Sequence, residues 1–92
     1  MDRHTKYSVD YTDKANKAFS KLDAFDRKTI LAWIDSKLQG CSDPRRFGGG
    51  LTGNRAHQWR YRIGDFRVIA DIQDDKVLIL IVDVGHRKKI YK

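Results

Sequence analysis

The stretch WRYRIGDFR at positions 59–67 decides how this chain folds. Side chains alternate between two faces along a β-strand, so the aromatic and aliphatic residues of its first half share one face while Arg60 and Arg62 share the other. Gly64 can adopt a positive φ, which suits a two-residue type II′ turn made of Gly64 and Asp65. The stretch therefore predicts a β-hairpin with one apolar face and one basic face.

A two-residue turn also fixes the register of this hairpin. It sets Ile63 opposite Phe66 and Arg62 opposite Arg67, so that with Arg60 three guanidinium groups gather on one face. Like charges directly opposite each other destabilise a sheet by up to about 1 kcal/mol, and a bound phosphate would offset that cost. From the hairpin alone a solvated face is an equal alternative, because arginines on edge strands also discourage aggregation.

The composition favours a small globular domain with a polyanionic partner. The chain has 92 residues, 40% of them hydrophobic and 34% charged, so we expect one domain over residues 1–92. The net charge of +7 and a pI near 9.8 favour nucleic acid, a ribonucleoprotein or an acidic protein as partner. Cys41 is the single cysteine, which excludes an intramolecular disulfide and a cysteine-based zinc site. The start of the chain has no apolar targeting segment and the apolar run 77–82 is too short for a membrane, so a cytoplasmic protein is expected.

The remaining periodicities predict the order strand, helix, helix and then three strands. Alternation at 7–11 indicates the first strand, and apolar spacing after Thr12 and after Asp23 indicates two capped helices joined as a hairpin. The later strands are expected at 56–63, 66–73 and 76–84. The fold class is therefore α+β, with the helical hairpin packed on one face of a largely antiparallel sheet. The basic side of the strand hairpin should lie on the open face.

Residues 41–54 are expected to form a loop, because they hold one proline, four glycines and the pair Arg45 and Arg46. The triple glycine at 48–50 lacks the ending of a phosphate-binding loop and does not join a strand to a helix. We expect it to let the chain turn tightly back into the sheet. Arg45 and Arg46 either widen a basic rim or are simply solvated.

The last eight residues, GHRKKIYK at 85–92, form a basic tail. A glycine at the end of a strand lets the backbone bend, which would turn Arg87 and Tyr91, and His86 with them, toward the open face and the arginines of the hairpin. The alternative is a frayed terminus, the usual state of terminal residues.

The chain resembles the RelE toxins of the RelE/ParE superfamily. The similarity lies in residues 59–69, the preceding Leu-Thr-Gly at 51–53, the turn at 74–75 and the segment 84–91, in the family's order and over nearly the whole chain. The resemblance implies the toxin of a type II toxin–antitoxin system, acting as a metal-independent endoribonuclease (an mRNA interferase) without a cofactor. Such toxins cut the codon in the ribosomal A site, where the 2′-hydroxyl of the RNA attacks the adjacent phosphate.

The resemblance also implies roles for individual residues. The catalytic positions are Arg67, Arg87 and Tyr91, and those expected to bind RNA phosphates are Arg60, Arg62, Lys88 and Lys89. Guanidinium groups suit the charge that develops on phosphorus, since they fork toward phosphate oxygens and stay protonated. Some relatives carry lysines at 60 and 62, so a proton-transfer role there is not expected.

Proton transfer needs a group that can titrate. Tyr91 is one candidate, because nearby arginines would lower its pKa, and His86 is a candidate acid or base whose free pKa suits neutral pH. The chain contains no glutamate. Dependence on the ribosome to orient the substrate follows from the resemblance.

The implied partners are a cognate RelB-like antitoxin, the 70S ribosome with its mRNA, and operator DNA bound by the toxin–antitoxin complex. Two alternatives stay open. A ParE-like toxin would share the fold and poison DNA gyrase without the catalytic cluster. A non-catalytic basic module would bind RNA or DNA and cleave nothing.

Overall fold

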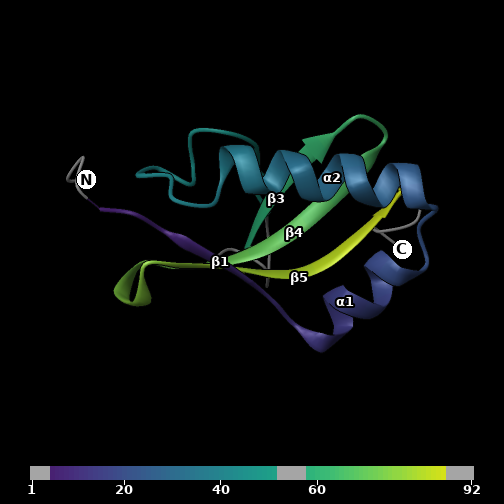
Figure 1. Ribbon diagram of the computed structural model, residues 1–92. Coiled ribbons are helices and arrows are strands. Elements are labelled where there is room, and N and C mark those ends of the chain that lie inside the picture. The colour runs from purple at the N-terminus through teal and green to yellow at the C-terminus, as the bar shows by residue number, and fades with distance from the viewer. Residues whose placement is uncertain (1–4, 52–57, 87–92) are drawn as a thin grey trace.

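The computed structural model describes residues 5–51 and 58–86 as two helices packed on a five-stranded sheet (Figure 1). In chain order the elements are β1 Ser8–Tyr11, α1 Asp13–Ser20, α2 Ala24–Lys37, β2 Gly49–Gly50, β3 Gln58–Ile63, β4 Phe66–Gln73, the 3₁₀ turn Asp74–Lys76 and β5 Leu78–His86. The strand order across the sheet is β1-β5-β4-β3-β2. The pairing of β1 with β5 is parallel and all others are antiparallel, so the sheet is mixed and largely antiparallel as predicted.

The hairpin formed by β3 and β4 has the predicted register. Arg62 faces Arg67, and Ile63 faces Phe66 across the two-residue turn. Gly64 has φ of +60°, the value that the first turn position of a type II′ turn requires and that other residues rarely adopt. The glycine therefore sets which residues of the two strands meet.

Both helices begin at the predicted caps. The Thr12 hydroxyl accepts a hydrogen bond from the Ala15 N–H at 3.0 Å, and the Asp23 carboxylate accepts one from the Asp26 N–H at 2.9 Å. Each cap satisfies an N–H that the first helical turn leaves without a partner. The glycine at position 40, with φ of +81°, follows the end of α2.

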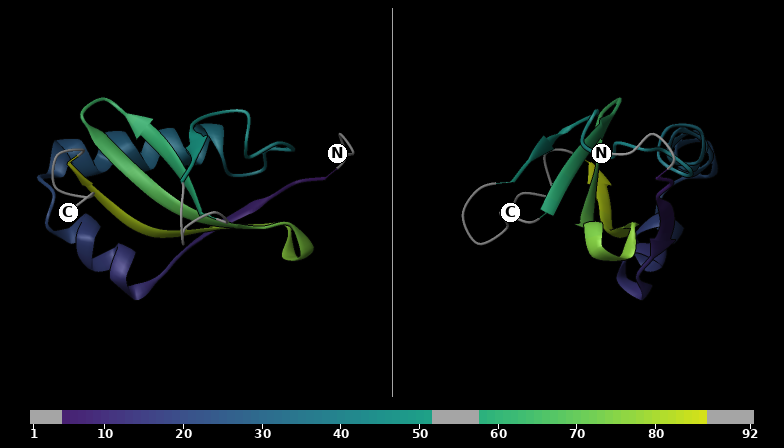
Figure 2. Two further views of the ribbon diagram at one scale, coloured as in Figure 1. Left: turned by 180° about the vertical axis from the view of Figure 1, so that it is seen from behind. Right: turned by 90° about the vertical axis from the view of Figure 1, so that its left-hand side faces the viewer.

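The two helices cover the same face of the sheet, as the edge-on view in Figure 2 shows. The core lies between them and the sheet, where Ile30 and Ile34 of α2 meet Tyr61, Val68 and other buried strand residues. Tyr61 and Val68 are completely buried, which matches the apolar side predicted for the hairpin. The opposite face is the one that carries the arginines of the hairpin.

Two details differ from the sequence-based prediction. The loop region contains a short edge strand, β2, in which Gly49 pairs with Arg60 and Gly50 pairs with Trp59. The prediction that Gly85 bends the chain out of the last strand is wrong, because β5 continues through it to His86. Within this ladder Gly85 pairs with Arg67 of β4, and His86 pairs with Phe66. No helix in residues 5–51 and 58–86 is long and apolar enough to cross a membrane.

Candidate functional site

Three arginines lie on the face of the sheet that the helices leave open, which we call the arginine face. Arg62 of β3 faces Arg67 of β4, and Arg60 lies two residues from Arg62 on the same side of the strand. Arg62 is exposed, whereas Arg60 and Arg67 are half-buried. Three permanent positive charges on a shared surface can bind a phosphodiester through forked hydrogen bonds.

The residues that alternate with these arginines hold β3 in its orientation. The Trp59 Nε1–H donates to the Phe47 carbonyl at 2.6 Å, and the Tyr61 hydroxyl donates to the Pro44 carbonyl at 2.6 Å. Both bonds tie β3 to the loop that follows α2. Because side chains alternate along a strand, fixing Trp59 and Tyr61 on one side directs Arg60 to the other.

The glycines before β3 allow the edge strand to lie close to Arg60. Gly48 has φ of +76°, and a Cβ there would collide with the Arg60 backbone carbonyl. A Cβ on Gly49 would come to 3.4 Å from the Arg60 guanidinium. The triple glycine thus serves close backbone packing of an edge strand, where the sequence had predicted a tight turn. The β2 residue that pairs with Arg60, Gly49, carries no side chain.

Arg45 belongs to a separate cluster at the turn between β4 and β5. Its two terminal nitrogens donate to the two Asp74 carboxylate oxygens at 3.0 Å each, and the Tyr7 hydroxyl donates to Asp74 at 2.6 Å. Hydrogen bonds from Arg45 and Tyr7 lower the pKa of Asp74. Burial, together with the hydrogen bond to Asp74, raises the pKa of Tyr7 to about 12. This cluster, the corner cluster, joins the start of β1, the loop and the turn.

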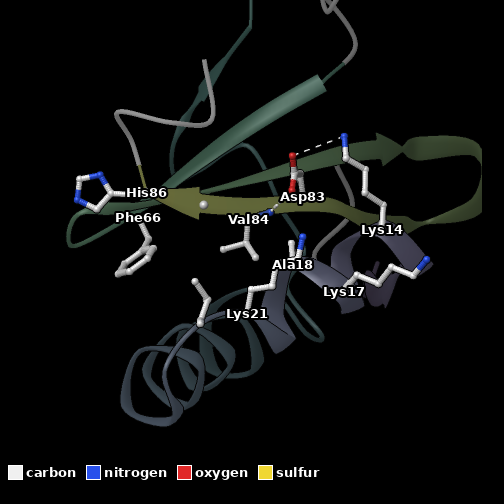
Figure 3. A pocket seen from close by; sticks show the side chains of 10 residues that line it. Lys14, Lys17, Ala18, Lys21, Phe66, Asp83, Val84 and His86 are labelled. Carbon is white, nitrogen blue, oxygen red and sulfur yellow. Dashed lines mark hydrogen bonds and ion pairs between the residues drawn. The ribbon is translucent and has the colours of Figure 1, made fainter. Parts of the chain in front are cut away.

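A β-bulge brings one carboxylate onto the arginine face. The register between β4 and β5 shifts at Ile69 and Ala70, so that Val82 is an extra residue on β5 and Ile69 faces Asp83. The bulge reverses the alternation, which returns Val84 to the buried side and leaves Asp83 on the other (Figure 3). Sequence reasoning missed Asp83, although an aspartate that interrupts an otherwise apolar strand was a visible signal.

The prediction that His86 joins the arginines is wrong. His86 faces Phe66, with ring centroids 5.8 Å apart, whereas Arg67 faces the neighbouring residue Gly85. Successive side chains of a strand point to opposite faces, so His86 lies on the helix side of the sheet.

His86 and Phe66 lie at one end of a groove between α1 and β5, with a volume of about 1060 Å³ (Figure 3). Lys14 and Lys17 of α1 and Lys21, which follows the helix, border it. Ala18, Leu22 and Val84 add apolar surface. Pairing with β1 ends at Ile81, so no neighbouring strand covers this edge of β5 beyond that residue in the described part of the chain. The groove therefore combines apolar surface, positive charge and a strand edge.

Four of the predicted site residues, Arg87, Lys88, Lys89 and Tyr91, lie outside the described residues. Of the others, the structure brings Arg60, Arg62 and Arg67 to one face. Among residues 5–51 and 58–86 no group of three histidine, cysteine or acidic side chains is placed to hold a metal ion.

Comparison with known proteins identifies relatives that match most of the chain. The family model for the ParE toxin of type II toxin–antitoxin systems matches residues 9–91. A RelE-like toxin protein of Escherichia coli is 29% identical over 86 residues, which are 91% of this chain and 86% of that protein.

Solved structures show the same fold. The RelBE2 toxin–antitoxin complex of Mycobacterium tuberculosis contains a chain with TM-score 0.83 and 25% identity, covering 95% of this chain and 98% of that one. A mutant of the Escherichia coli toxin RelE in the free state has TM-score 0.74 and 20% identity, covering 94% of this chain and 88% of that one. The expected RelE-like α+β fold is thus confirmed.

Proposed function

This chain belongs to the ParE toxin family of type II toxin–antitoxin systems, within the RelE/ParE superfamily, and from this premise we propose that it is a ribosome-dependent endoribonuclease. It cuts mRNA in the ribosomal A site by attack of a 2′-hydroxyl on the adjacent phosphate. The products are a 2′,3′-cyclic phosphate and a 5′-hydroxyl.

The observation that carries the proposal is the direct pairing of Arg62 with Arg67 on the open face of the sheet. Cleavage places extra negative charge on the oxygens around phosphorus, and two guanidinium groups facing the same space can stabilise it. Arg60 and Arg62 hold the RNA phosphates, and Arg67 acts at the scissile one. Removing one donor of this kind from an active site typically slows the reaction by about 10²–10³-fold.

The tail completes this assignment. We assign Arg87 to the scissile phosphate beside Arg67, Lys88 and Lys89 to neighbouring phosphates, and Tyr91 to proton transfer; all four rest on the family resemblance. His86 is left out of the catalytic set, because it lies beside Phe66 on the helix side.

Mapping mRNA 5′ ends on translating ribosomes tests the proposal. Wild-type protein should produce cuts within the A-site codon, and Arg67→Ala should lose them by about 10²-fold or more while still binding ribosomes. Arg46→Ala is the matched control, because it removes the same charge from an exposed loop residue that stacks on Phe47. It should cut at close to the wild-type rate.

Other outcomes of this experiment would point elsewhere. Intact mRNA together with inhibited DNA supercoiling would identify a gyrase-directed toxin, the activity for which ParE toxins are known. Salt-sensitive RNA binding without any cleavage would identify a binding module, since each phosphate contact adds to the salt dependence.

The proposed partner is a RelB-like antitoxin, with which the toxin also binds operator DNA. Several of the solved relatives are complexes of a RelE toxin with RelB. The groove between α1 and β5 suits an acidic segment with apolar residues, because its apolar surface is bordered by lysines. Replacing Lys17 and Lys21 by glutamate should weaken antitoxin binding at low salt more than the neutral change to glutamine. Equal affinity in both variants would exclude this groove.

A further inference from the structure

The proposed cleavage lacks an identified proton acceptor in the described part of the chain. Arginine stays protonated in proteins and cannot accept the proton of a 2′-hydroxyl. By strand register, three carboxylates of the described strands point to the arginine face: Asp10, Asp71 and Asp83. Asp10 and Asp71 both lie beside Leu80, whereas Asp83 faces Ile69, one row nearer to Arg67.

Asp83 lies near Gly85, the β5 residue that pairs with Arg67 and has no side chain. No side chain of β5 therefore occupies the position opposite Arg67. Asp83 precedes Gly85 by two residues on the same strand, a separation of about 7 Å. A phosphodiester above Gly85 would therefore have the Arg67 guanidinium on one side and the Asp83 carboxylate at one end.

The carboxylate of Asp83 is held in place but still accessible. Its Oδ1 accepts a hydrogen bond from the Val84 N–H at 2.9 Å, and its Oδ2 lies 3.6 Å from Lys14 Nζ. The Asp83 side chain is 28% exposed, and that of Lys14 is 76% exposed. Lys14 reaches Asp83 from α1, around the edge of β5 that β1 does not cover (Figure 3). Each oxygen keeps acceptor capacity for a further hydrogen bond.

We propose that Asp83 is the general base of the RNA cleavage; the inference rests on the proposed function. The proton of the 2′-hydroxyl moves to Asp83, a bond forms between the 2′-oxygen and phosphorus, and the bond from phosphorus to the 5′-oxygen breaks. The 5′-oxygen takes a proton from Tyr91, the residue to which the family resemblance assigns proton transfer, and a water molecule carries the proton of Asp83 back to the tyrosinate. Arg67 stabilises the charge on the other phosphorus oxygens during this transfer.

Asp83→Asn tests the proposal, because asparagine keeps the shape and can still accept the Val84 N–H bond. Single-turnover cleavage of ribosome-bound mRNA should fall by about 10²–10⁴-fold, the usual contribution of a general base. Ribosome affinity and the thermal midpoint should stay close to wild type. Asp71→Asn, the same change on a carboxylate of the same face, should cleave at close to the wild-type rate.

An RNA with sulfur in place of the scissile 5′-oxygen separates the base from the acid. A thiolate leaves without a proton, so loss of a general acid is rescued on this substrate, whereas loss of the base is not. Asp83→Asn should therefore stay slow on the thio-substituted mRNA.

Three results would overturn the assignment. The first is Asp83→Asn cutting within about fivefold of wild type while Arg67→Ala is inactive, which leaves the ribonuclease proposal standing. The second is rescue by the thio-substituted mRNA. The third is an equal loss in Lys14→Met, which would show that only the ion pair with α1 matters. If wild-type protein cuts no mRNA, the proposed function itself fails, and the role of Asp83 fails with it.

Discussion

The corner cluster and the arginine face use the same residue type in opposite ways. In the corner cluster, Arg45 makes two 3.0 Å hydrogen bonds to Asp74, so positive and negative charge balance. On the arginine face, Arg62 faces Arg67, so like charges meet across two strands. The first arrangement stabilises a fold, whereas the second costs up to about 1 kcal/mol.

This contrast between paired and facing charges indicates which region of the domain carries function. The chain has 12 acidic residues that could pair with arginine. In the corner cluster one of them, Asp74, pairs with Arg45. Facing arginines that bring no stability to the sheet are better explained by a ligand with negative charge. The comparison predicts that variants of the corner cluster change stability and that variants of the arginine face change activity.

The largest expected stability effect comes from Tyr61, which anchors the loop beside the corner cluster. Tyr61→Phe removes the hydroxyl that donates to the buried Pro44 carbonyl. A buried acceptor left without its partner costs about 1–3 kcal/mol, so the free energy of unfolding should fall by that amount. Urea unfolding followed by tryptophan fluorescence measures it.

Tyr11→Phe is the control for this change, because no hydrogen bond to the Tyr11 hydroxyl is found among the described residues and the ring packs edge-on against Phe19. It should alter the free energy of unfolding by less than about 0.5 kcal/mol. Equal losses in the two variants would mean that ring burial, and not the bond to Pro44, holds the loop.

Much of this contrast could be predicted from the sequence because the signals were local. The alternation in β3, the positive φ of Gly64 and the caps Thr12 and Asp23 each depend on a few neighbouring residues, and all are confirmed. They were sufficient to set Arg62 opposite Arg67. Whether Arg45 was paired or solvated stayed open, because its partner Asp74 is 29 residues away.

Two features could not be predicted from the sequence, the bulge on β5 and the face of His86, because both depend on how β5 pairs with β4. The bulge on β5 is an adjustment to β4, and it places Asp83 on the arginine face, opposite Ile69. His86 was assigned to the wrong face because the prediction ended the strand at Val84 and bent the chain at Gly85, whereas the ladder with β4 extends to His86. A shift of one residue moves a side chain to the other face of a sheet.

A smaller effect is expected from paired changes of arginine in the two regions. Arg45→Ala removes the bidentate, partly exposed ion pair with Asp74, so it should lower the free energy of unfolding by about 1 kcal/mol. Arg62→Ala removes a like-charge pairing and should raise it by a few tenths of a kcal/mol. Urea unfolding of both variants with wild type, at the same salt concentration, gives the two differences.

Repeating the measurement at high salt tests whether the two effects are electrostatic. Screening should then reduce both differences in the free energy of unfolding toward zero. If Arg62→Ala destabilises the fold as much as Arg45→Ala, the facing arginines are structural. The contrast between the two regions would then disappear.

The smallest expected effect is a pH dependence confined to the corner cluster. Hydrogen bonds from Arg45 and Tyr7 lower the pKa of Asp74 in the folded protein, whereas in the unfolded chain it has the ordinary value of about 3.9. Folding therefore favours the ionised form. This contribution is fully present above the unfolded pKa and is lost as the pH falls through the lower folded pKa.

Asp74→Asn should consequently be less stable than wild type at pH 6, and the difference should shrink as the pH falls from about 4 toward 2. The Asp74 side chain is 53% exposed, so solvent screening limits this pH-dependent part to roughly 0.5 kcal/mol. The same change in the Arg45→Ala background is the control, because the main hydrogen-bond donor to Asp74 is then absent and the difference should depend less on pH. A difference that stays constant for Asp74→Asn would mean that Arg45 and Tyr7 bind the amide as well as the carboxylate, so that the charge of Asp74 contributes nothing to the corner cluster.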